Sequence, residues 1–257
     1  MLNIIEIPTL NLILAYIFVL ITILIARFFK LSREKEIITA TLRMTVQLYI
    51  VGYILKYIFD TKSVILAILM LCVMEGFAVS NALSRAKVKV RLTLKFISAI
   101  SLVGGTVITL FLFLTIIIGL KTFDARYIIS ISGMVIGNSM TAMSIAARSL
   151  CNGMTRDKAK VESALMLGAT PRQASTNIIR EAFTLAAMPN INSMVGMGIV
   201  SLPGMMTGQI LAGQSPLIAT RYQIAILLGI CGSVTLCCAV FLVLGYKTFF
   251  SKRAQLL

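Results

Sequence analysis

The sequence predicts an all-α integral membrane protein with about seven transmembrane helices, and three observations lead to this fold class. Of its 257 residues, 58% are hydrophobic and only 13% are charged, which is too little polar surface for a soluble globule. Uncharged runs long enough to cross a hydrocarbon core of ~30 Å recur along the chain. Lysines and arginines collect in alternate connections between these runs, as they do in multi-pass membrane proteins.

The apolar runs define the expected spans. They are, in chain order, 7–26, 37–58, 63–84, 96–120, 127–147, 182–220 and 222–246. The second and third runs carry isolated charges, at Arg43, Lys56 and Glu75. The sixth is longer than one crossing needs, so we expect a broken helix with short surface pieces there. Together the runs form a single transmembrane domain over residues 1–257.

The net charge of +15 is distributed unevenly between the two sides of the predicted membrane. Four segments that fall on one side hold most of the basic residues: 27–35, 85–95, 148–180 and 247–253. This asymmetry predicts an amino terminus outside, a carboxyl terminus inside and an odd number of crossings. The basic excess is then a topology signal and an attraction to anionic lipid, so we expect no nucleic-acid partner. The first run has no basic region ahead of it, which favours a first span over a cleaved signal. We expect a multi-pass protein of the inner (plasma) membrane.

One polar stretch interrupts the apolar sequence after Val161. Gly168 predicts the end of a helix, because glycine tolerates a positive φ, and Thr170 with Pro171 predicts the cap and first position of a second, short helix. An ordinary helix-turn-helix connection would have the same shape. The order Glu162-Ser-Ala followed by Gly168 resembles the cytoplasmic loop with which ABC-transporter permeases engage their ATPase. We therefore predict a coupling loop at about 148–188, with these contact residues: Glu162, Gly168, Ala169, Thr170, Pro171 and Arg172.

Polar side chains within spans are functional candidates, because an ionised group at the bilayer centre costs ~2.5 kcal/mol or more. Arg43 and Gln47 are one helical turn apart and share a face, although an arginine near the cytoplasmic end can also extend to the interface. Glu75 lies near mid-span, and Cys72 lies one turn before it. The two form a candidate cation site of carboxylate and thiol ligands. Pairing of Glu75 with Arg43 or with a neighbouring amide explains the same residue equally well.

A second candidate region is the Pro203-Gly204 pair, which breaks a helix and frees backbone groups. We interpret it as the centre of a transport path or as the seam of a dimer. Small residues four apart at Gly133 and Gly137, and at Gly204 and Gly208, predict close helix packing. The complete predicted path comprises Arg43, Gln47, Glu75, Asn138, Pro203, Gly204, Met205, Met206 and Gln209.

The chain lacks the residues of an enzyme. It has no histidine, and therefore no Ser-His or Cys-His pair, and it has no glycine-rich phosphate loop. We expect it to bind no cofactor. ATP-driven work would need ATP and Mg²⁺ on a separate subunit.

Three segments carry a resemblance that extends over nearly the whole chain: Gly133-Met-Val-Ile-Gly-Asn138, Leu167-Gly-Ala-Thr-Pro-Arg-Gln-Ala174 and Ser201-Leu-Pro-Gly-Met-Met-Thr-Gly208. Their order resembles the Fet-type iron-export ABC permease family. The resemblance implies a permease that pairs with a cytoplasmic ABC ATPase and, in bacteria, exports iron. We also expect a second copy of the chain as a partner. Plant relatives are associated with aluminium tolerance and nucleotide-sugar movement, so the family leaves the cargo open between a metal ion and another small solute.

One departure concerns the loop. Other ABC permeases have a Leu-Pro pair near the end of the second loop helix, where this chain has Ile179-Arg180-Glu181, and its next proline is Pro189. Two other classes of protein remain open. An ATP-independent secondary transporter or channel would use Glu75 as its ion or proton site, and a membrane scaffold would carry no flux at all.

Overall fold

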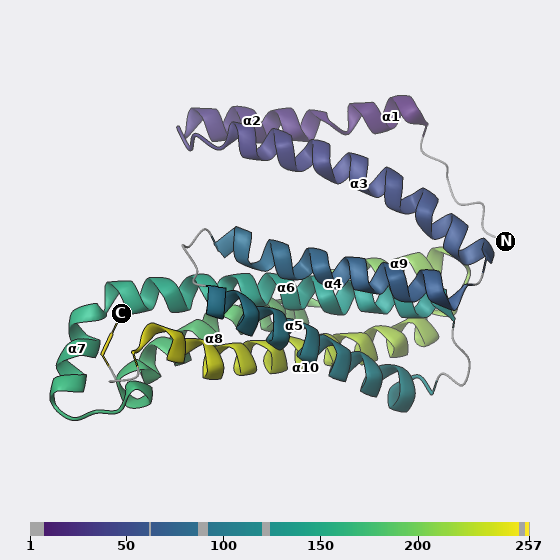
Figure 1. Cartoon of the computed structure of the whole chain (residues 1–257). Coiled ribbons are helices and arrows are strands. Elements are labelled where there is room, and N and C mark those ends of the chain that lie inside the picture. The colour runs from purple at the N-terminus through teal and green to yellow at the C-terminus, as the bar shows by residue number, and fades with distance from the viewer. Residues whose placement is uncertain (1–7, 62, 87–91, 120–123, 252–254, 257) are drawn as a thin grey trace. The chain divides into compact units, whose positions relative to one another are not determined.

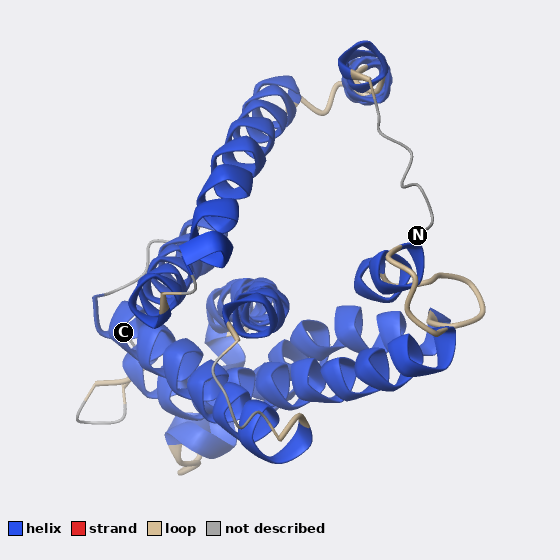
Figure 2. Ribbon diagram, turned by 90° about the vertical axis from the view of Figure 1, so that its right-hand side faces the viewer, coloured by secondary structure: helices blue, strands red, loops and turns tan. Residues whose placement is uncertain are grey.

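The computed structural model describes residues 8–61, 63–86, 92–119, 124–251 and 255–256. Within these ranges every regular element is a helix, as the sequence predicts, and Figure 2 shows only helices and loops. The residues form two compact units. The first comprises Met1–Ser63 with Leu211–Gly213, and the second comprises Val64–Ile210 with Gln214–Leu257.

The first unit is a pair of long helical segments. α1 (Thr9–Leu14) and α2 (Ile17–Phe28) follow each other, and α2 packs against α3 (Glu34–Thr61). The Tyr16 hydroxyl, at the break between α1 and α2, lies 2.6 Å from the Thr45 hydroxyl of α3. Most apolar side chains of these helices are exposed, which suits surfaces that face lipid.

The second unit is a bundle of helices (Figure 1). Its elements are α4 (Val64–Ala86), α5 (Leu92–Leu112), the π-turn η1 (Phe113–Ile117), α6 (Ala125–Arg156), α7 (Lys158–Met166), α8 (Pro171–Gly196), α9 (Gly204–Leu211), α10 (Pro216–Gly245) and the 3₁₀ turn η2 (Tyr246–Phe249). α6 lies at the centre, in contact with α4, α5, α8 and α10. Its buried face includes Ile131, Val135, Met143 and Leu150, so the core of the protein lies around this helix.

Side-chain contacts give the relative directions of the helices. The rings of Tyr127 and Tyr222, near the starts of α6 and α10, stack with their centroids 6.2 Å apart. Further along the same two helices, the hydroxyls of Ser139 and Ser233 lie 2.9 Å apart. α6 and α10 therefore run parallel, and the chain between them must return along the bundle. α8 packs against both and makes this return.

The membrane spans agree with the expected pattern. Six helical segments of the described residues are long and apolar enough to cross a membrane: Thr9–Phe28, Glu34–Thr61, Val64–Ala82, Leu92–Ile117, Ala125–Arg156 and Pro216–Phe249. α8 is the seventh long helix; its first half carries Arg172, Arg180 and Glu181, and its second half is uncharged. The expected break in 182–220 is confirmed, because α8 ends at Gly196 and residues 197–203 are not helical.

Glycines allow the closest helix contacts, but not all at the positions that the spacing predicts. A Cβ on Gly153 would lie 2.5 Å from Ile178, and one on Gly229 would lie 2.9 Å from the Phe113 ring. Gly133 does lie against Met74, at 3.2 Å. Among the described residues, a Cβ on Gly137, Gly204 or Gly208 would meet no atom of another element within 4 Å. The predicted close packing at these three is therefore not made among the described residues, since a four-residue spacing gives a smooth face and does not choose which helix covers it.

Candidate functional site

The first candidate site is the turn that joins α7 to α8 at one end of the bundle (Figure 1). α7 ends at Met166, and Gly168 has a φ of +89°. The Gly168 amide donates to the Leu165 carbonyl and the Ala169 amide to the Ala164 carbonyl, both at 3.0 Å. These two bonds form a Schellman motif, which ends a helix with a glycine in the left-handed region. The predicted helix end at Gly168 is confirmed.

The start of α8 is also as predicted, with one correction. Thr170 caps α8 through a capping box with Gln173: the Gln173 amide donates to the Thr170 hydroxyl at 3.3 Å, and the Thr170 amide donates back to Gln173 at 2.8 Å. Pro171 is the first helical residue. The expectation of a short second helix is wrong, because α8 has 26 residues and continues to Gly196. Ile179-Arg180-Glu181 offers no helix breaker, and the helix accommodates Pro189. The short helix of the loop is α7, with 9 residues.

Two large apolar side chains project from this turn. Met166 is 84% exposed and Leu167 is 90% exposed, directly after a helix that carries Lys158, Lys160 and Glu162. Charged residues on both sides place the turn outside the hydrocarbon core, so lipid tails do not explain the exposure. The sequence interpretation missed this pair. The available signal was a Met-Leu dipeptide directly before a helix-ending glycine within an otherwise charged loop.

An ion-pair network fixes the base of the turn. Arg156, the last residue of α6, lies 3.0 Å from Asp157 and 3.0 Å from Glu181 of α8. Lys160 of α7 lies 3.1 Å from Asp157. Hydrogen bonds from Arg156 first, and then from Lys160, hold the pKa of Asp157 below its ordinary range. The network joins α6, α7 and α8, and none of its members was among the predicted site residues. The predicted Glu162 pairs instead with Lys158 on its own helix, at 3.7 Å.

The second candidate site is a line of polar groups inside the bundle, which we call the polar track: Glu75, Thr106, the Leu102 carbonyl, Cys237, Ser233 and Ser139. On α5, the Thr106 hydroxyl is in hydrogen-bond contact with one carboxylate oxygen of Glu75 and lies 2.8 Å from the Leu102 carbonyl oxygen. The other carboxylate oxygen of Glu75 is buried without a hydrogen-bond partner.

The track continues from α5 into α10 and α6. The Cys237 thiol lies 3.6 Å from the same Leu102 carbonyl oxygen and 3.9 Å from the Ser233 hydroxyl. Ser233 then meets Ser139 of α6. Thr106, Cys237, Ser233 and Ser139 are all fully buried. Four helices thus bring together one carboxylate, one thiol and three hydroxyls.

The remaining predicted path residues lie elsewhere. Cys72 is exposed and takes no part in the polar track, although it is one turn from Glu75. Asn138 is exposed and donates to the Met134 carbonyl of its own helix at 2.8 Å. Arg43 and Gln47 are exposed on α3 in the first unit. The structure therefore brings Glu75 together with residues that periodicity did not select.

The Pro203-Gly204 region is a separate feature. Pro203 closes the non-helical segment, and Gly204 starts α9. Met205, which packs against the core, and Met206 are half-buried. The side-chain oxygen of Gln209 is buried without a hydrogen-bond partner. The predicted break exists, and its role in transport stays a prediction.

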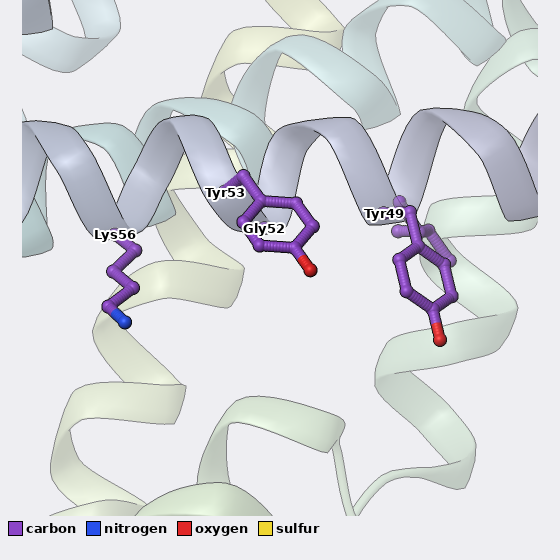
Figure 3. Close-up of a pocket in the computed structure, with 5 residues that line it drawn as sticks. Tyr49, Gly52, Tyr53 and Lys56 are labelled. Atoms are coloured by element: carbon purple, nitrogen blue, oxygen red, sulfur yellow. The ribbon is translucent and has the colours of Figure 1, made fainter. Parts of the chain in front are cut away.

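Cavities and metal-ligand groups add little to these two sites. An open hollow of about 440 Å³ lies along α3, and its lining includes Tyr49, Gly52, Tyr53 and Lys56 (Figure 3). Among the described residues no group of three or more His, Cys, Asp or Glu side chains gathers as a metal site. The metal pair of Cys72 and Glu75 stays a prediction.

Comparison with known proteins identifies the group of proteins to which these features belong. A family model described as uncharacterised protein family UPF0014 matches residues 9–250 and so extends over both units. The chain is 38% identical to "UPF0014 membrane protein YjkA" of Bacillus subtilis, over 96% of this chain and 97% of the relative. It is 36% identical to "Probable iron export permease protein FetB" of Escherichia coli, over 96% and 93%. It is 34% identical to "Protein ALUMINUM SENSITIVE 3" of Arabidopsis thaliana, over 94% and 87%.

No solved structure matches the chain. The predicted resemblance to the Fet-type permeases is confirmed, since the relative FetB carries that name and aligns over almost the full length of both chains. With a family match over residues 9–250 and six apolar spans in the described residues, this multi-pass membrane protein belongs to the UPF0014 family.

Proposed function

We propose that this chain is the permease subunit of an ATP-driven ABC transporter that exports a metal ion, with iron as the first candidate. The observation that supports the coupling role best is the α7–α8 turn, where Met166 and Leu167 are exposed at the end of the bundle beyond the spans. The similarity to FetB, a probable iron export permease, supports iron export as the direction and cargo. The chain has no phosphate-binding loop, so ATP and Mg²⁺ belong to a separate ABC ATPase subunit.

The geometry of the turn suits transmission of force. The Schellman motif and the capping box fix the backbone on both sides of Gly168, so a push on Met166 and Leu167 moves α7 and the start of α8 together. Arg156 carries this displacement to the end of α6 and to Glu181 on α8. α6 is the central helix of the bundle, and its movement changes the packing around the polar track. A second copy of the chain would complete the permease.

Co-purification of the full chain from its native membrane in mild detergent tests the proposal. We expect a near-equimolar ABC ATPase with the wild-type chain. Combined Met166→Ser and Leu167→Ser substitution should reduce the recovered ATPase at least tenfold, because it removes the exposed apolar pair. Gly168→Asp should weaken it as well, since aspartate is strained at a φ of +89° and adds a charge to the contact face.

Leu217→Ser is the matched control, because Leu217 is an exposed leucine (76%) at the start of α10, at the other end of the bundle from α7. It should leave ATPase recovery unchanged. Equal loss in the control would show general instability and would remove the special role of the turn. Recovery of a well-folded chain without any ATPase would refute the ABC assignment and would favour a gradient-driven transporter that uses Glu75.

A further inference from the structure

We propose that the polar track is the cargo site, and that it holds one divalent transition-metal ion of intermediate softness between the Glu75 carboxylate and the Cys237 thiolate. The hydroxyls of Thr106, Ser139 and Ser233 complete its surroundings. The inference rests on the proposed function in one respect, namely that the bound ion is cargo and leaves again. It replaces the Cys72–Glu75 pair, which periodicity predicts, by a pair that only the tertiary packing brings to the same turn of α5.

The first step concerns the carboxylate. Glu75 has one oxygen in contact with Thr106 and one buried oxygen without a partner. No lysine or arginine of the described residues forms an ion pair with it. A half-buried carboxylate with one buried oxygen in an apolar bundle is costly unless it binds a proton or a cation, because water solvates its charge poorly. Glu75 therefore needs a positive partner that the described side chains do not supply.

The charges on the packed helices are too distant to serve. α5 carries Lys95, α6 carries Arg126, Arg148 and Arg156, and α10 carries Arg221. Arg126 is nearest to the level of Glu75, because Gly133 of α6 lies against Met74; it is seven residues before Gly133 (133 minus 126), which corresponds to roughly 10 Å along a helix. The other titratable group of the polar track is the Cys237 thiol, which reaches the same turn of α5 as Thr106.

The second step concerns the thiol. Cys237 is fully buried, and its sulfur packs onto the backbone of α5 where Gly105 has no side chain. The Leu102 carbonyl oxygen is shared, because the Thr106 hydroxyl and the Cys237 thiol both reach it, at 2.8 Å and 3.6 Å. Carboxylate and thiol thus approach the same turn of α5 from α4 and from α10. The two proposed ligands, Glu75 and Cys237, therefore come from different helices and meet the same backbone turn of α5.

The Thr106 hydroxyl links the two states of this site. A hydroxyl carries one proton, so Thr106 can donate to Glu75 or to the Leu102 carbonyl, but not to both at once. When Glu75 is protonated it donates to Thr106, and Thr106 donates to Leu102. When a cation replaces the protons of Glu75 and Cys237, Thr106 is free to donate to the carboxylate. Binding of the ion therefore releases up to two protons, one from each ligand.

The ligand types select the class of ion. A carboxylate with hydroxyls alone would suit Mg²⁺ or Ca²⁺, whereas a thiolate favours softer ions. One carboxylate and one thiolate together neutralise a double positive charge, which lowers the cost of an ion inside the bundle. No histidine competes, since the chain has none. The site is suited to Fe²⁺, Zn²⁺ or Co²⁺ and disfavours Mg²⁺ and Ca²⁺.

Cobalt(II) tests the site, because a thiolate ligand gives Co²⁺ an intense charge-transfer absorption that oxygen ligands do not give. The purified full-length chain is titrated anaerobically with Co²⁺, and absorption and proton release are recorded together. We expect the charge-transfer band to appear with the parent chain and to be displaced by Fe²⁺ but not by Mg²⁺. Cys237→Ser should abolish the band. Glu75→Gln should weaken Co²⁺ binding at least tenfold, and Glu75→Asp should restore part of it.

Cys231→Ser is the matched control, since Cys231 lies on the same helix as Cys237 and outside the polar track. It should leave the band unchanged, and the elution profile of each variant in detergent shows whether it is folded. A band that survives Cys237→Ser, unaltered affinity in Glu75→Gln, or no Co²⁺ binding by the folded parent would each overturn the site.

Co-purification separates this inference from the proposed function. Glu75→Gln should still recover the ABC ATPase, because the α7–α8 turn is unchanged. Loss of Co²⁺ binding with normal ATPase recovery supports the cargo site. Co²⁺ binding by a chain that recovers no ATPase would leave the site standing and refute the ABC permease.

Discussion

At the scale of single residues, small and polar side chains decide which groups meet inside the bundle. Gly105 lets the Cys237 sulfur reach the backbone of α5, since a Cβ there would lie 2.3 Å from that sulfur. A Cβ on its neighbour Gly104 would meet no atom of another described element within 4 Å. Two adjacent glycines of the same helix therefore have different roles: one makes room for a ligand of the polar track, and the other faces open space.

Gly105→Ala should destabilise the protein by about 1–3 kcal/mol, because the added methyl group overlaps the buried thiol and the α10 backbone. The same substitution at Gly104 should be neutral or slightly stabilising, since alanine favours helix. Thermal unfolding in detergent measures both. Equal stability of the two variants would show that the contact between α5 and α10 is looser than the structure describes.

Asp157 gives the turn a pH dependence. Its pKa is lowered by the hydrogen bonds from Arg156 and Lys160, so the stabilisation is fully present above the ordinary carboxyl pKa of ~3.9. This stabilisation is lost as the pH falls below the ordinary carboxyl pKa and then through the lowered pKa of Asp157. Hydrogen exchange of the α7 amides, corrected for its intrinsic rate, should stay flat from about pH 7 to 5 and rise below about pH 4.

Asp157→Asn provides the comparison for this effect. Asparagine keeps the size of the side chain but removes the charge, so exchange in α7 should be raised at neutral pH and should change little on acidification. A parent chain whose corrected exchange does not vary over the acidic range would show that the ion pairs do not hold α7.

At the scale of elements, the caps of α7 and α8 explain why the chain turns where it does. Gly168 accepts a positive φ, and Thr170 and Gln173 cap each other across the first turn of α8. The Gly168 and Thr170 signals are local and were predicted from the sequence, whereas the part of Gln173 in the cap came from the structure. The length of α8 was not, because nothing in the residues after Pro171 fixes where the helix stops before Gly196.

Thr170→Ala should destabilise the first turn of α8 by about 1 kcal/mol, since the alanine leaves the Gln173 amide without its acceptor. Thr176→Ala serves as the control, because Thr176 is half-buried on the same helix and donates to the Arg172 carbonyl, away from the cap. Hydrogen exchange should rise at residues 171–174 in the first variant alone. Similar exchange in both variants would exclude the capping box as a stabilising feature.

The contact between α6 and α8 depends on Gly153. A Cβ at this position would lie 2.5 Å from Ile178, so Gly153→Ala should push the two helices apart and destabilise the protein by about 1–3 kcal/mol. Gly137→Ala, on the same helix, should be tolerated, because the added Cβ would meet no atom of another described element within 4 Å. Unfolding in detergent measures the packing defect, and ATPase recovery measures the loss of coupling. We expect Gly153→Ala to show both.

At the scale of the whole molecule, the parallel arrangement of α6 and α10 agrees with an odd number of crossings. Both helices start at one end of the bundle, and α7 lies at the other. The positive-inside pattern then puts α7 in the cytoplasm and the start of α10 outside. The orientation remains a prediction of the charge distribution.

Labelling of introduced thiols tests this orientation. Ser163→Cys on α7 should react with a membrane-impermeant maleimide only in inside-out vesicles, and Ser215→Cys only in intact cells. Both serines are exposed, and the parent chain gives the background of its native cysteines. Labelling of both sites from the same side would contradict the seven-crossing topology.

The sequence by itself determined the fold class, the spans, the break before Gly204 and the caps at Gly168 and Thr170, because hydropathy, charge and backbone preference act over short stretches of chain. It also selected Glu75 as a functional candidate, since a carboxylate in a span is costly wherever it lies. Only the tertiary structure decided what Glu75 meets. Thr106, Cys237, Ser233 and Ser139 lie on three other helices, and hydroxyls and thiols are too common in membrane helices to be selected by periodicity. Helix packing in lipid depends on the fit between side chains that are far apart in the sequence, and no local pattern predicts that fit. The polar track and the neighbours of each glycine could therefore be identified only in the folded chain.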